Sequence, residues 1–163
     1  MAYSTLTLAD SILNLITKND TDTSTYDVSK SLNQRVNYTA VGFHAKKPLR
    51  IDQYPAIFIE PGNRIEEFET ASGSGNRNMT VPFNIVSITQ YGAGQEDGRN
   101  LADREMIQLS DNLSYLFRAY PRLSNTSYVL QAGIDGVEFG VEEYENTYNS
   151  ISRISLQVRI KSS

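Results

Sequence analysis

The 163-residue sequence contains no cysteine and no tryptophan, and it has a single histidine. Without cysteine, neither disulfide bonds nor thiolate metal sites can hold the fold, so packing and hydrogen bonding must do so. No apolar run is long enough to span a bilayer, and the first residues lack a basic start followed by an apolar stretch. We therefore expect a soluble, unprocessed protein that does not associate with membranes.

Basic charge is also scarce. Fifteen Lys and Arg residues stand against 19 Asp and Glu residues, giving a formal net charge of −4 and a pI of about 5.0. Proteins that grip a phosphate backbone over a wide surface need clustered Lys and Arg, so this class is disfavoured. The chain is instead rich in tyrosine and phenylalanine, with ten and six residues. Such aromatic side chains are common at contacts between proteins.

Two helices are predicted from apolar residues at helical spacing. The first follows a weak capping box at Thr7 and runs from about Leu8 to Lys18. The second begins near Asp97 or Gly98 and is stopped by Pro121. Its apolar stripe consists of Ala102, Met106, Leu109, Leu113, Leu116, Phe117 and Tyr120. At about 20 residues this amphipathic helix is roughly 30 Å long, enough to cover one face of a sheet.

Strands are predicted where apolar residues alternate or run together between turn signals. The segments are 36–45, 54–60, 65–70, 79–89, 128–132, 137–141 and a last strand in which Ile154, Leu156, Val158 and Ile160 alternate with polar residues. Segments 65–70 and 79–89 are expected to form a hairpin with a mobile tip at residues 71–78. Asp135-Gly136 is expected to be a two-residue hairpin turn, because such turns need positive φ. Pro82 cannot donate to a ladder, which places it at an edge or a bulge.

The predicted elements do not alternate between strand and helix, so nothing demands a parallel sheet. The sequence shows no internal repeat and no break in composition. We predict a single α+β domain over residues 1–163, with a mixed or mainly antiparallel β-sheet. The long amphipathic helix packs on one face of this sheet, and a shorter helix lies at the N-terminus.

Residues that carry chemistry form no catalytic or metal-binding pattern. His44 has no nucleophile elbow to serve, so a surface or half-buried strand residue is the preferred interpretation. Asp20 and Asp22 resemble the start of a calcium loop, but Thr25 and Ser31 stand where that loop needs glycine and a bidentate glutamate. We predict no catalytic residue, no metal site, no cofactor and no enzymatic activity.

The glycines from Gly92 to Gly98 follow a predicted strand and open a helix, the setting of a phosphate-binding loop. Their spacing is wrong by one residue, and Glu96 and Asp97 would put negative charge where a phosphate must lie. Acidic side chains at this position stabilise a helix N-terminus. Helix capping is therefore preferred over nucleotide binding.

Acidic residues gather in the C-terminal third, at Glu138, Glu142, Glu143 and Glu145. With Glu66, Glu67 and Glu69 they could supply the carboxylate pair of a glycosidase, but no pattern orders them. A solvated acidic face is the preferred interpretation. Such a face repels nucleic acid, which is useful where DNA must pass without binding.

The order of elements resembles that of the tail terminator, or tail completion, proteins of tailed bacteriophages. The resemblance covers about Leu8 to Lys161 and rests on the order of the elements and on a few short sequence segments. These are the N-terminal helix, the strand Tyr54-Pro55-Ala56-Ile57-Phe58-Ile59, a hairpin with a loose tip, the long helix and the closing strand from Ser155 to Lys161.

This resemblance implies a homohexameric ring that caps the tail tube, ends its polymerisation and offers a surface to the head-side connector or stopper. The protein would be made in the host cytoplasm and reside in the tail or neck of the virion, with DNA passing through without specific binding. An intersubunit or tube-facing arm would comprise Gly73, Ser74, Gly75, Asn76, Arg77 and Asn78. An acidic lumen face would comprise Glu138, Glu142, Glu143 and Glu145.

Two alternatives remain open at this point. Within the same class, the chain is compatible with another neck or stopper protein of the head–tail connector. From a different class, a monomeric protein- or carbohydrate-binding module would use the tyrosines as a stacking surface. A binding module stays monomeric, whereas a terminator forms rings in solution or on its tube.

Overall fold

The computed structural model describes residues 4–17, 36–44, 49–63, 77–92, 97–123, 127–144 and 146–162. Its elements are α1 (Thr5–Thr17), β1 (Tyr38–Val41), a short 3-10 helix η1 (Ile51–Gln53), β2 (Ala56–Pro61), β3 (Arg77–Gly92), α3 (Gly98–Ala119), β4 (Val129–Tyr144) and β5 (Thr147–Ser162). In these ranges, two α-helices accompany a five-stranded mixed sheet. The predicted α+β class is therefore confirmed.

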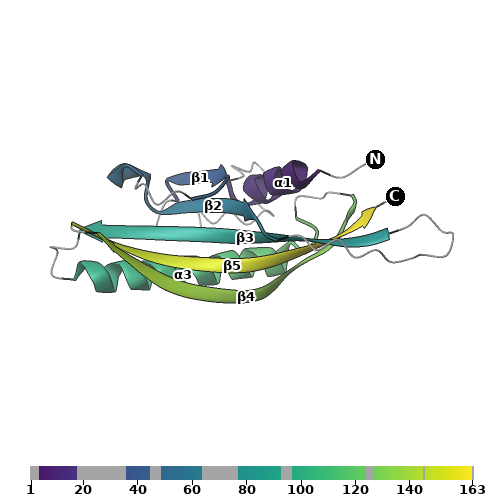
Figure 1. Ribbon diagram of the computed structural model, residues 1–163. Coiled ribbons are helices and arrows are strands. Elements are labelled where there is room, and N and C mark those ends of the chain that lie inside the picture. The colour runs from purple at the N-terminus through teal and green to yellow at the C-terminus, as the bar shows by residue number, and fades with distance from the viewer. Residues whose placement is uncertain are drawn as a thin grey trace.

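The strands lie in the order β1-β2-β3-β5-β4 (Figure 1). β1 and β2 are parallel, and the other three pairs of neighbours are antiparallel. β3 and β5 pair along their whole length, from Arg77 opposite Ser162 to Gly92 opposite Thr147. Strands β3, β5 and β4 thus form a long curved ribbon, and the shorter β2 and β1 continue the sheet on one side of it.

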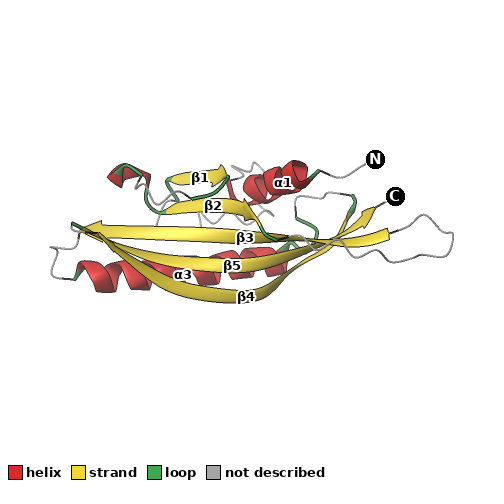
Figure 2. Cartoon of the chain, viewed as in Figure 1, coloured by secondary structure: helices red, strands yellow, loops and turns green. Residues whose placement is uncertain are grey.

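α1 and α3 cover the same face of the sheet, which we call the helix face (Figure 2). One hydrophobic core joins buried side chains of both helices to those of β2, β3 and β5 that point to this face. In β5 these are Ile154, Leu156, Val158 and Ile160, all completely buried. Their alternation with polar residues in the sequence is the pattern of a strand with one buried face.

The opposite, far face of the sheet is covered in part by a smaller apolar cluster. Tyr54, Ala56, Phe58, Val86 and Ile88 are buried there, with Leu49 and Ile151 among the residues packed against them. The backbone N–H of Leu49 donates to the Tyr54 hydroxyl over 3.1 Å. β2 is therefore buried on both faces, which explains why its sequence is continuously apolar rather than alternating.

The start of α1 differs from the prediction. The helix begins at Thr5, not Leu8, and Thr7 lies inside its first turn. The Thr7 N–H donates to the Ser4 side-chain oxygen over 3.4 Å, and the Leu8 N–H donates to the Ser4 carbonyl over 3.0 Å. Ser4 therefore does the capping expected of Thr7, since either hydroxyl can accept from an N–H two or three residues on.

The hairpin predicted at Asp135-Gly136 is wrong. β4 continues through both residues, and the register with β5 shifts between Ile134 and Gly136, so the extra residue Asp135 forms a bulge. Within the described residues, positive φ occurs at Leu123 and Gly42 and not at Asp135 or Gly136. The observed hairpin joins β4 to β5, with Tyr144 opposite Thr147.

Pro82 lies in β3, which is an inner strand and not an edge strand. It nevertheless disrupts no ladder bond to β2, because the last register pair of β2 with β3 joins Pro61 to Phe83. Its carbonyl accepts the Gly62 N–H over 2.9 Å. The proline thus occupies the local edge that begins where β2 ends, so that the predicted edge position is correct only locally.

α3 begins and ends as predicted, after Asp97 and before Pro121. Its buried residues include Ala102, Met106, Leu109, Leu113, Leu116 and Phe117. Asp97 occupies the N-cap position but makes no side-chain capping hydrogen bond. Its carbonyl accepts the Leu101 N–H over 2.9 Å, so the backbone alone closes the first turn.

Candidate assembly surface

β4 forms one edge of the sheet, because β5 is its only partner among the described strands. The strand is 16 residues long, well above the usual length of about five or six. An edge strand presents a row of N–H and C=O groups that can pair with another chain, and natural proteins shorten, charge or cover such edges. β4 is thus the first candidate for a surface that meets a partner.

Exposed apolar side chains gather on the same strand. In the described part of the chain, the large apolar residues with high exposure are Leu6, Phe43, Leu101, Ile107, Tyr115, Leu130, Val137, Phe139 and Val141. Four of these belong to β4, and Phe139 is 57% exposed. The register pairs Val137 with Ile154 and Phe139 with Ser152, so these side chains point to the helix face. We call Val137, Phe139 and Val141 the edge patch.

The edge patch stays exposed because α3 lies over β3 and β5 more than over β4. Between α3 and these two inner strands lie Ser87 and Ser152, directly opposite each other in the register and both completely buried. Their small side chains leave room for the helix close to β3 and β5. The apolar side chains at the edge of β4 have no cover in the described residues.

The predicted acidic lumen residues do not share one face. Glu138 and Glu142 alternate with the edge patch and so point to the far face. Glu143 points to the helix face, where its carboxylate lies 2.9 Å from the Arg99 guanidinium of α3. Glu145 lies outside the described residues. The lumen assignment thus stays a prediction. Of the described residues in the predicted set, Glu138 and Glu142 share a face of the sheet.

The predicted arm, residues 73–78, is described only in part. Gly73, Ser74, Gly75 and Asn76 lie outside them. Arg77 and Asn78 belong to β3, opposite Ser162 and Lys161. The strand therefore begins two residues earlier than the sequence suggested, because β5 is long enough to pair with both. Segments 19–31 and 65–70, which hold the calcium-like loop and the predicted partner of β3, also lie outside the described residues.

The main cluster of titratable groups joins α3 to the sheet. Tyr91 and Tyr148 are register partners on β3 and β5. The Tyr148 hydroxyl lies 3.1 Å from Asp103 Oδ1, and the Tyr91 hydroxyl donates to Glu105. Because Asp103 and Glu105 belong to the same helix, the two tyrosine–acid pairs fasten the first half of α3 to neighbouring strands.

Burial and hydrogen bonding shift the pKa values in this cluster. Burial raises the pKa of Glu105 above its ordinary value, and the hydrogen bond from Tyr91 opposes that rise. The same hydrogen bond, together with burial, raises the pKa of Tyr91 to about 12. Burial and the bond to Asp103 raise the pKa of Tyr148. Raised tyrosine pKa values favour neutral hydrogen-bond donors, which suits fastening and not proton transfer near neutral pH.

The only histidine is also engaged in a structural contact. His44 Nδ1 lies 2.9 Å from Glu60 Oε1, and the His44 backbone N–H donates to the same oxygen over 3.0 Å. Glu60 is 6% exposed, at the end of β2. The pair joins the chain after β1 to β2. The predicted strand 36–45 is shorter than expected: β1 ends at Val41, directly before Gly42 with its φ of 145°. Sequence analysis missed this pair, since 16 residues separate its members.

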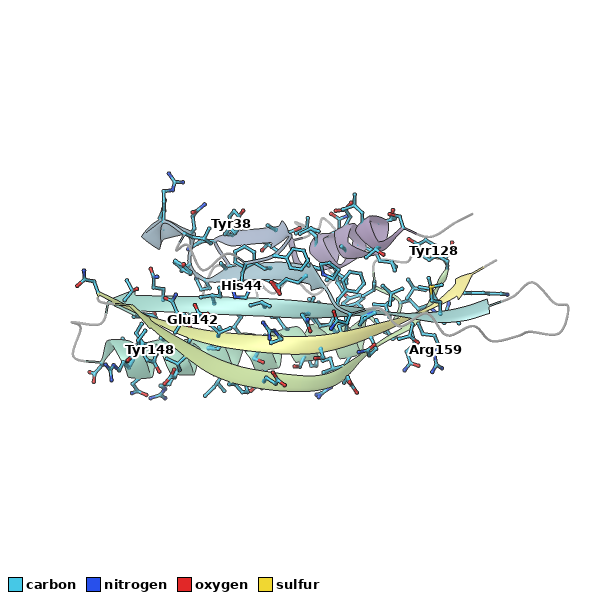
Figure 3. The ribbon with its side chains drawn as sticks, viewed as in Figure 1. Tyr38, His44, Tyr128, Glu142, Tyr148 and Arg159 are labelled. Atoms are coloured by element: carbon cyan, nitrogen blue, oxygen red, sulfur yellow. The ribbon has the colours of Figure 1, made fainter. Side chains whose placement is uncertain are left out.

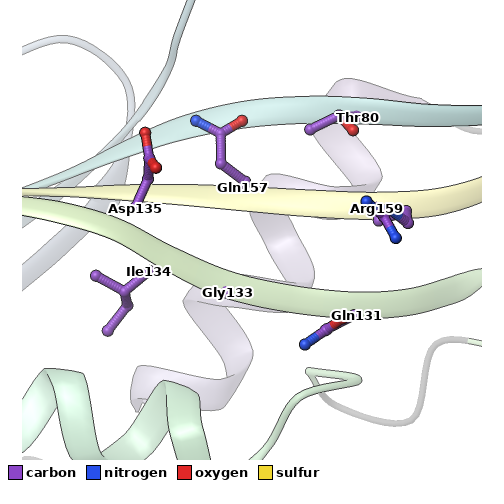
Figure 4. Close-up of a pocket in the computed structure, with 7 residues that line it drawn as sticks. All are labelled: Thr80, Gln131, Gly133, Ile134, Asp135, Gln157 and Arg159. Atoms are coloured by element: carbon purple, nitrogen blue, oxygen red, sulfur yellow. The ribbon is translucent and has the colours of Figure 1, made fainter.

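A shallow cleft of about 250 Å³ opens on the far face near the bulge of β4 (Figure 4). Seven residues line it: Thr80, Gln131, Gly133, Ile134, Asp135, Gln157 and Arg159. Arg159 lies toward the opposite end of the molecule from Glu142 and Tyr148 (Figure 3). The lining has neither a histidine nor a pair of carboxylates, so the cleft lacks the side chains of the hydrolytic mechanisms considered from the sequence.

Among the described residues, no three His, Asp or Glu side chains are grouped closely enough to hold a metal ion. No helix in these ranges combines the length and apolar character needed to cross a membrane. Comparison with protein-family models gave no match, and comparison with curated protein sequences gave none either.

Proposed function

We propose that this chain is a structural virion protein of a tailed bacteriophage. Copies of it assemble into a ring, with six as the expected number, on the end of the tail tube. The ring ends tube polymerisation and offers an attachment surface to the head-side connector or stopper. The observation that carries this proposal is the long edge strand β4 with its exposed patch of Val137, Phe139 and Val141.

A monomer with this edge is exposed to uncontrolled pairing with other strands. Assembly with further copies covers both the edge and its apolar side chains, and a ring repeats one heterologous contact around an axis. A mainly antiparallel sheet with a long amphipathic helix on one face suits this role. The helix completes the core, while the edges and part of the far face stay available to partners.

The contacts of the titratable groups support a structural role over a catalytic one. The two tyrosine–acid pairs fasten α3, and the His44–Glu60 pair fastens the end of β1. In the proposed ring DNA passes without specific binding, and the far face of the sheet suits this because it carries both acidic and basic side chains. Glu138 on β4 lies opposite Arg153 on β5, a pairing that lowers net attraction to a phosphate backbone.

Light scattering after size exclusion, across a concentration series and followed by negative-stain imaging, tests the proposal. The expected species has about six times the 18.3 kDa subunit mass and a central hole. Binding at one end of isolated tail tubes would separate a terminator from another neck or stopper protein. A protein that stays monomeric at every concentration and leaves tube ends bare would contradict the proposal.

A matched pair of variants links the assembly to β4. Phe139→Asp should abolish or strongly weaken the ring, because it puts a charge in the centre of the edge patch. Leu101→Asp changes a similarly exposed apolar residue on α3, 46% exposed, and should leave the ring intact. Equal loss in both variants would mean that β4 is not the contact surface.

A further inference from the structure

The sheet has two outer strands among the described residues, β1 and β4, at opposite ends of the strand order. β1 runs parallel to β2, and each following neighbour reverses direction, so β4 runs opposite to β1. If the sheets of two copies are placed side by side in the same orientation, β4 of one copy meets β1 of the next. The two strands are then antiparallel, the arrangement with the better hydrogen-bond geometry.

The two outer strands differ in charge. β4 contains Asp135, Glu138, Glu142 and Glu143 and no Lys or Arg. β1, Tyr38–Val41, contains no charged residue. Two β4 edges brought together around a twofold axis would face acid with acid, and pairing of β4 with β1 avoids this repulsion.

Apolar side chains are also exposed on both sides of the molecule. The edge patch on β4 is matched at the other end of the sheet by Phe43, which follows β1 and is 72% exposed. Leu6 of α1, the helix that packs on β1 and β2, is 61% exposed. Since α1 and the edge patch are both on the helix face, a neighbouring α1 would lie on the side of the sheet where the patch needs cover.

We infer that β4 of one copy pairs antiparallel with the β1 edge of the next copy, in a head-to-tail arrangement. This inference rests on the proposed function in that it takes the partner to be a second copy of this chain. The contact is heterologous, so it propagates from copy to copy and closes into a ring where the rotation between neighbours permits. Repulsion between acidic side chains disfavours the alternative arrangement, in which β4 pairs with a second β4.

Engineered cysteines test the contact directly, because the chain has no cysteine of its own. Thr39 is the register partner of Ile57, so its side chain points to the helix face, as the edge patch does. A cysteine at Thr39 is combined with a second at each helix-facing position of β4, beginning with Val137, Phe139 and Val141. After mild oxidation, at least one double variant should give a ladder of covalent oligomers. Each single variant should give none.

Light scattering before oxidation gives the mass of the oligomers in the same samples. It separates the proposed ring assembly from the inferred contact between β4 and β1. Oligomers that form no ladder with any cysteine along β4 would overturn the inference and leave ring assembly standing. Covalent dimers from a single β4 cysteine would also overturn it, since they report pairing of two β4 edges. A ladder from open filaments without closed rings would support the edge contact and contradict the proposed ring. Absence of any oligomer would overturn both.

Discussion

The hydroxyl of Tyr91 donates a hydrogen bond to the carboxylate of Glu105, joining strand β3 to helix α3. Glu105 is 8% exposed, so its charged form is poorly solvated and depends on this donor. The pair is one of two such contacts, with Tyr148 and Asp103, that fix the helix to the sheet. The position of α3 in turn leaves the edge patch of β4 uncovered in the described residues.

Glu105→Gln should flatten the pH dependence of stability. Burial raises the pKa of Glu105 in the folded protein above the ordinary 4.5. Between these two values the folded state holds more protons than the unfolded state, so the free energy of unfolding falls as pH rises through this window. Glutamine stays neutral and still accepts from Tyr91.

The measurement is urea unfolding of both proteins at several pH values between about 4 and 8. The stability of Glu105→Gln relative to the unmodified protein should rise with pH across this range. Asp111→Asn, which removes an exposed carboxylate from the same helix, is the matched control. A relative stability that falls with pH would show that the charged form of Glu105 is favoured in the folded state.

Tyr91→Phe should destabilise the protein at neutral pH and reduce its sensitivity to alkali. Loss of the hydroxyl leaves Glu105 buried without this donor, which costs about 1–3 kcal/mol. The pKa of Tyr91 is raised to about 12, so the unmodified protein loses stability as pH rises from about 10 to about 12, where only the unfolded state has released the proton.

Denaturant unfolding near pH 7 and alkaline titration followed by circular dichroism check both parts of this prediction. Part of the alkaline sensitivity should remain, because burial also raises the pKa values of Tyr54, Tyr128 and Tyr148. Combining Tyr91→Phe with Glu105→Gln should restore some of the stability lost in the single tyrosine variant. A purely additive double variant would argue against a direct interaction between the two side chains.

Ser152→Ala should leave stability unchanged or raise it by up to about 1 kcal/mol. The hydroxyls of Ser152 and its register partner Ser87 are buried and have no hydrogen-bond partner among the residues that the structure describes. Removing an unsatisfied buried hydroxyl avoids its desolvation cost and changes the packing little. Ser152→Leu provides the contrast, because a large side chain there forces α3 from the sheet. Thermal unfolding compares them, and a clearly destabilised alanine variant would mean that the hydroxyl has a partner.

Leu109→Ala and Ile107→Ala compare two positions on one helix. Leu109 is 1% exposed and belongs to the main core, so its truncation should cost about 2–5 kcal/mol in the free energy of unfolding. Ile107 is 52% exposed and should change stability by less than about 0.5 kcal/mol. Denaturant unfolding of the two variants measures both values. Comparable losses would show that the outer side of α3 is packed in solution.

Local patterns in the sequence predicted the elements whose partners lie on one side. The alternation in β5 and the apolar stripe of α3 each mark one buried face, and both elements occur where the pattern indicated. Pro121 marks the end of α3 for a reason local to the chain, because proline cannot continue a helix. The candidate edge was harder to predict, because the sequence pattern of an edge strand is similar to that of a central strand.

The errors occur where a signal has two physical outcomes. Asp135-Gly136 suits a tight turn but equally a bulge, and pairing of β4 with a long β5 selected the bulge. Ser4 and Thr7 can both cap a helix, and in the structure it is Ser4 that accepts from the Thr7 N–H. Glu142 and Glu143 are adjacent in sequence, yet the alternation of a strand sends them to opposite faces.

The sequence by itself determined the α+β class, the extent of α3 and the inward residues of β5, because these depend on spacing along a few consecutive turns or pleats. Only the tertiary structure decided which strand became the open edge, which acids share a face, and which tyrosine meets which carboxylate. Those outcomes depend on pairings between residues far apart in the chain, such as Tyr148 with Asp103 and His44 with Glu60. No local pattern encodes them, since each depends on how distant strands and helices come together in the folded chain.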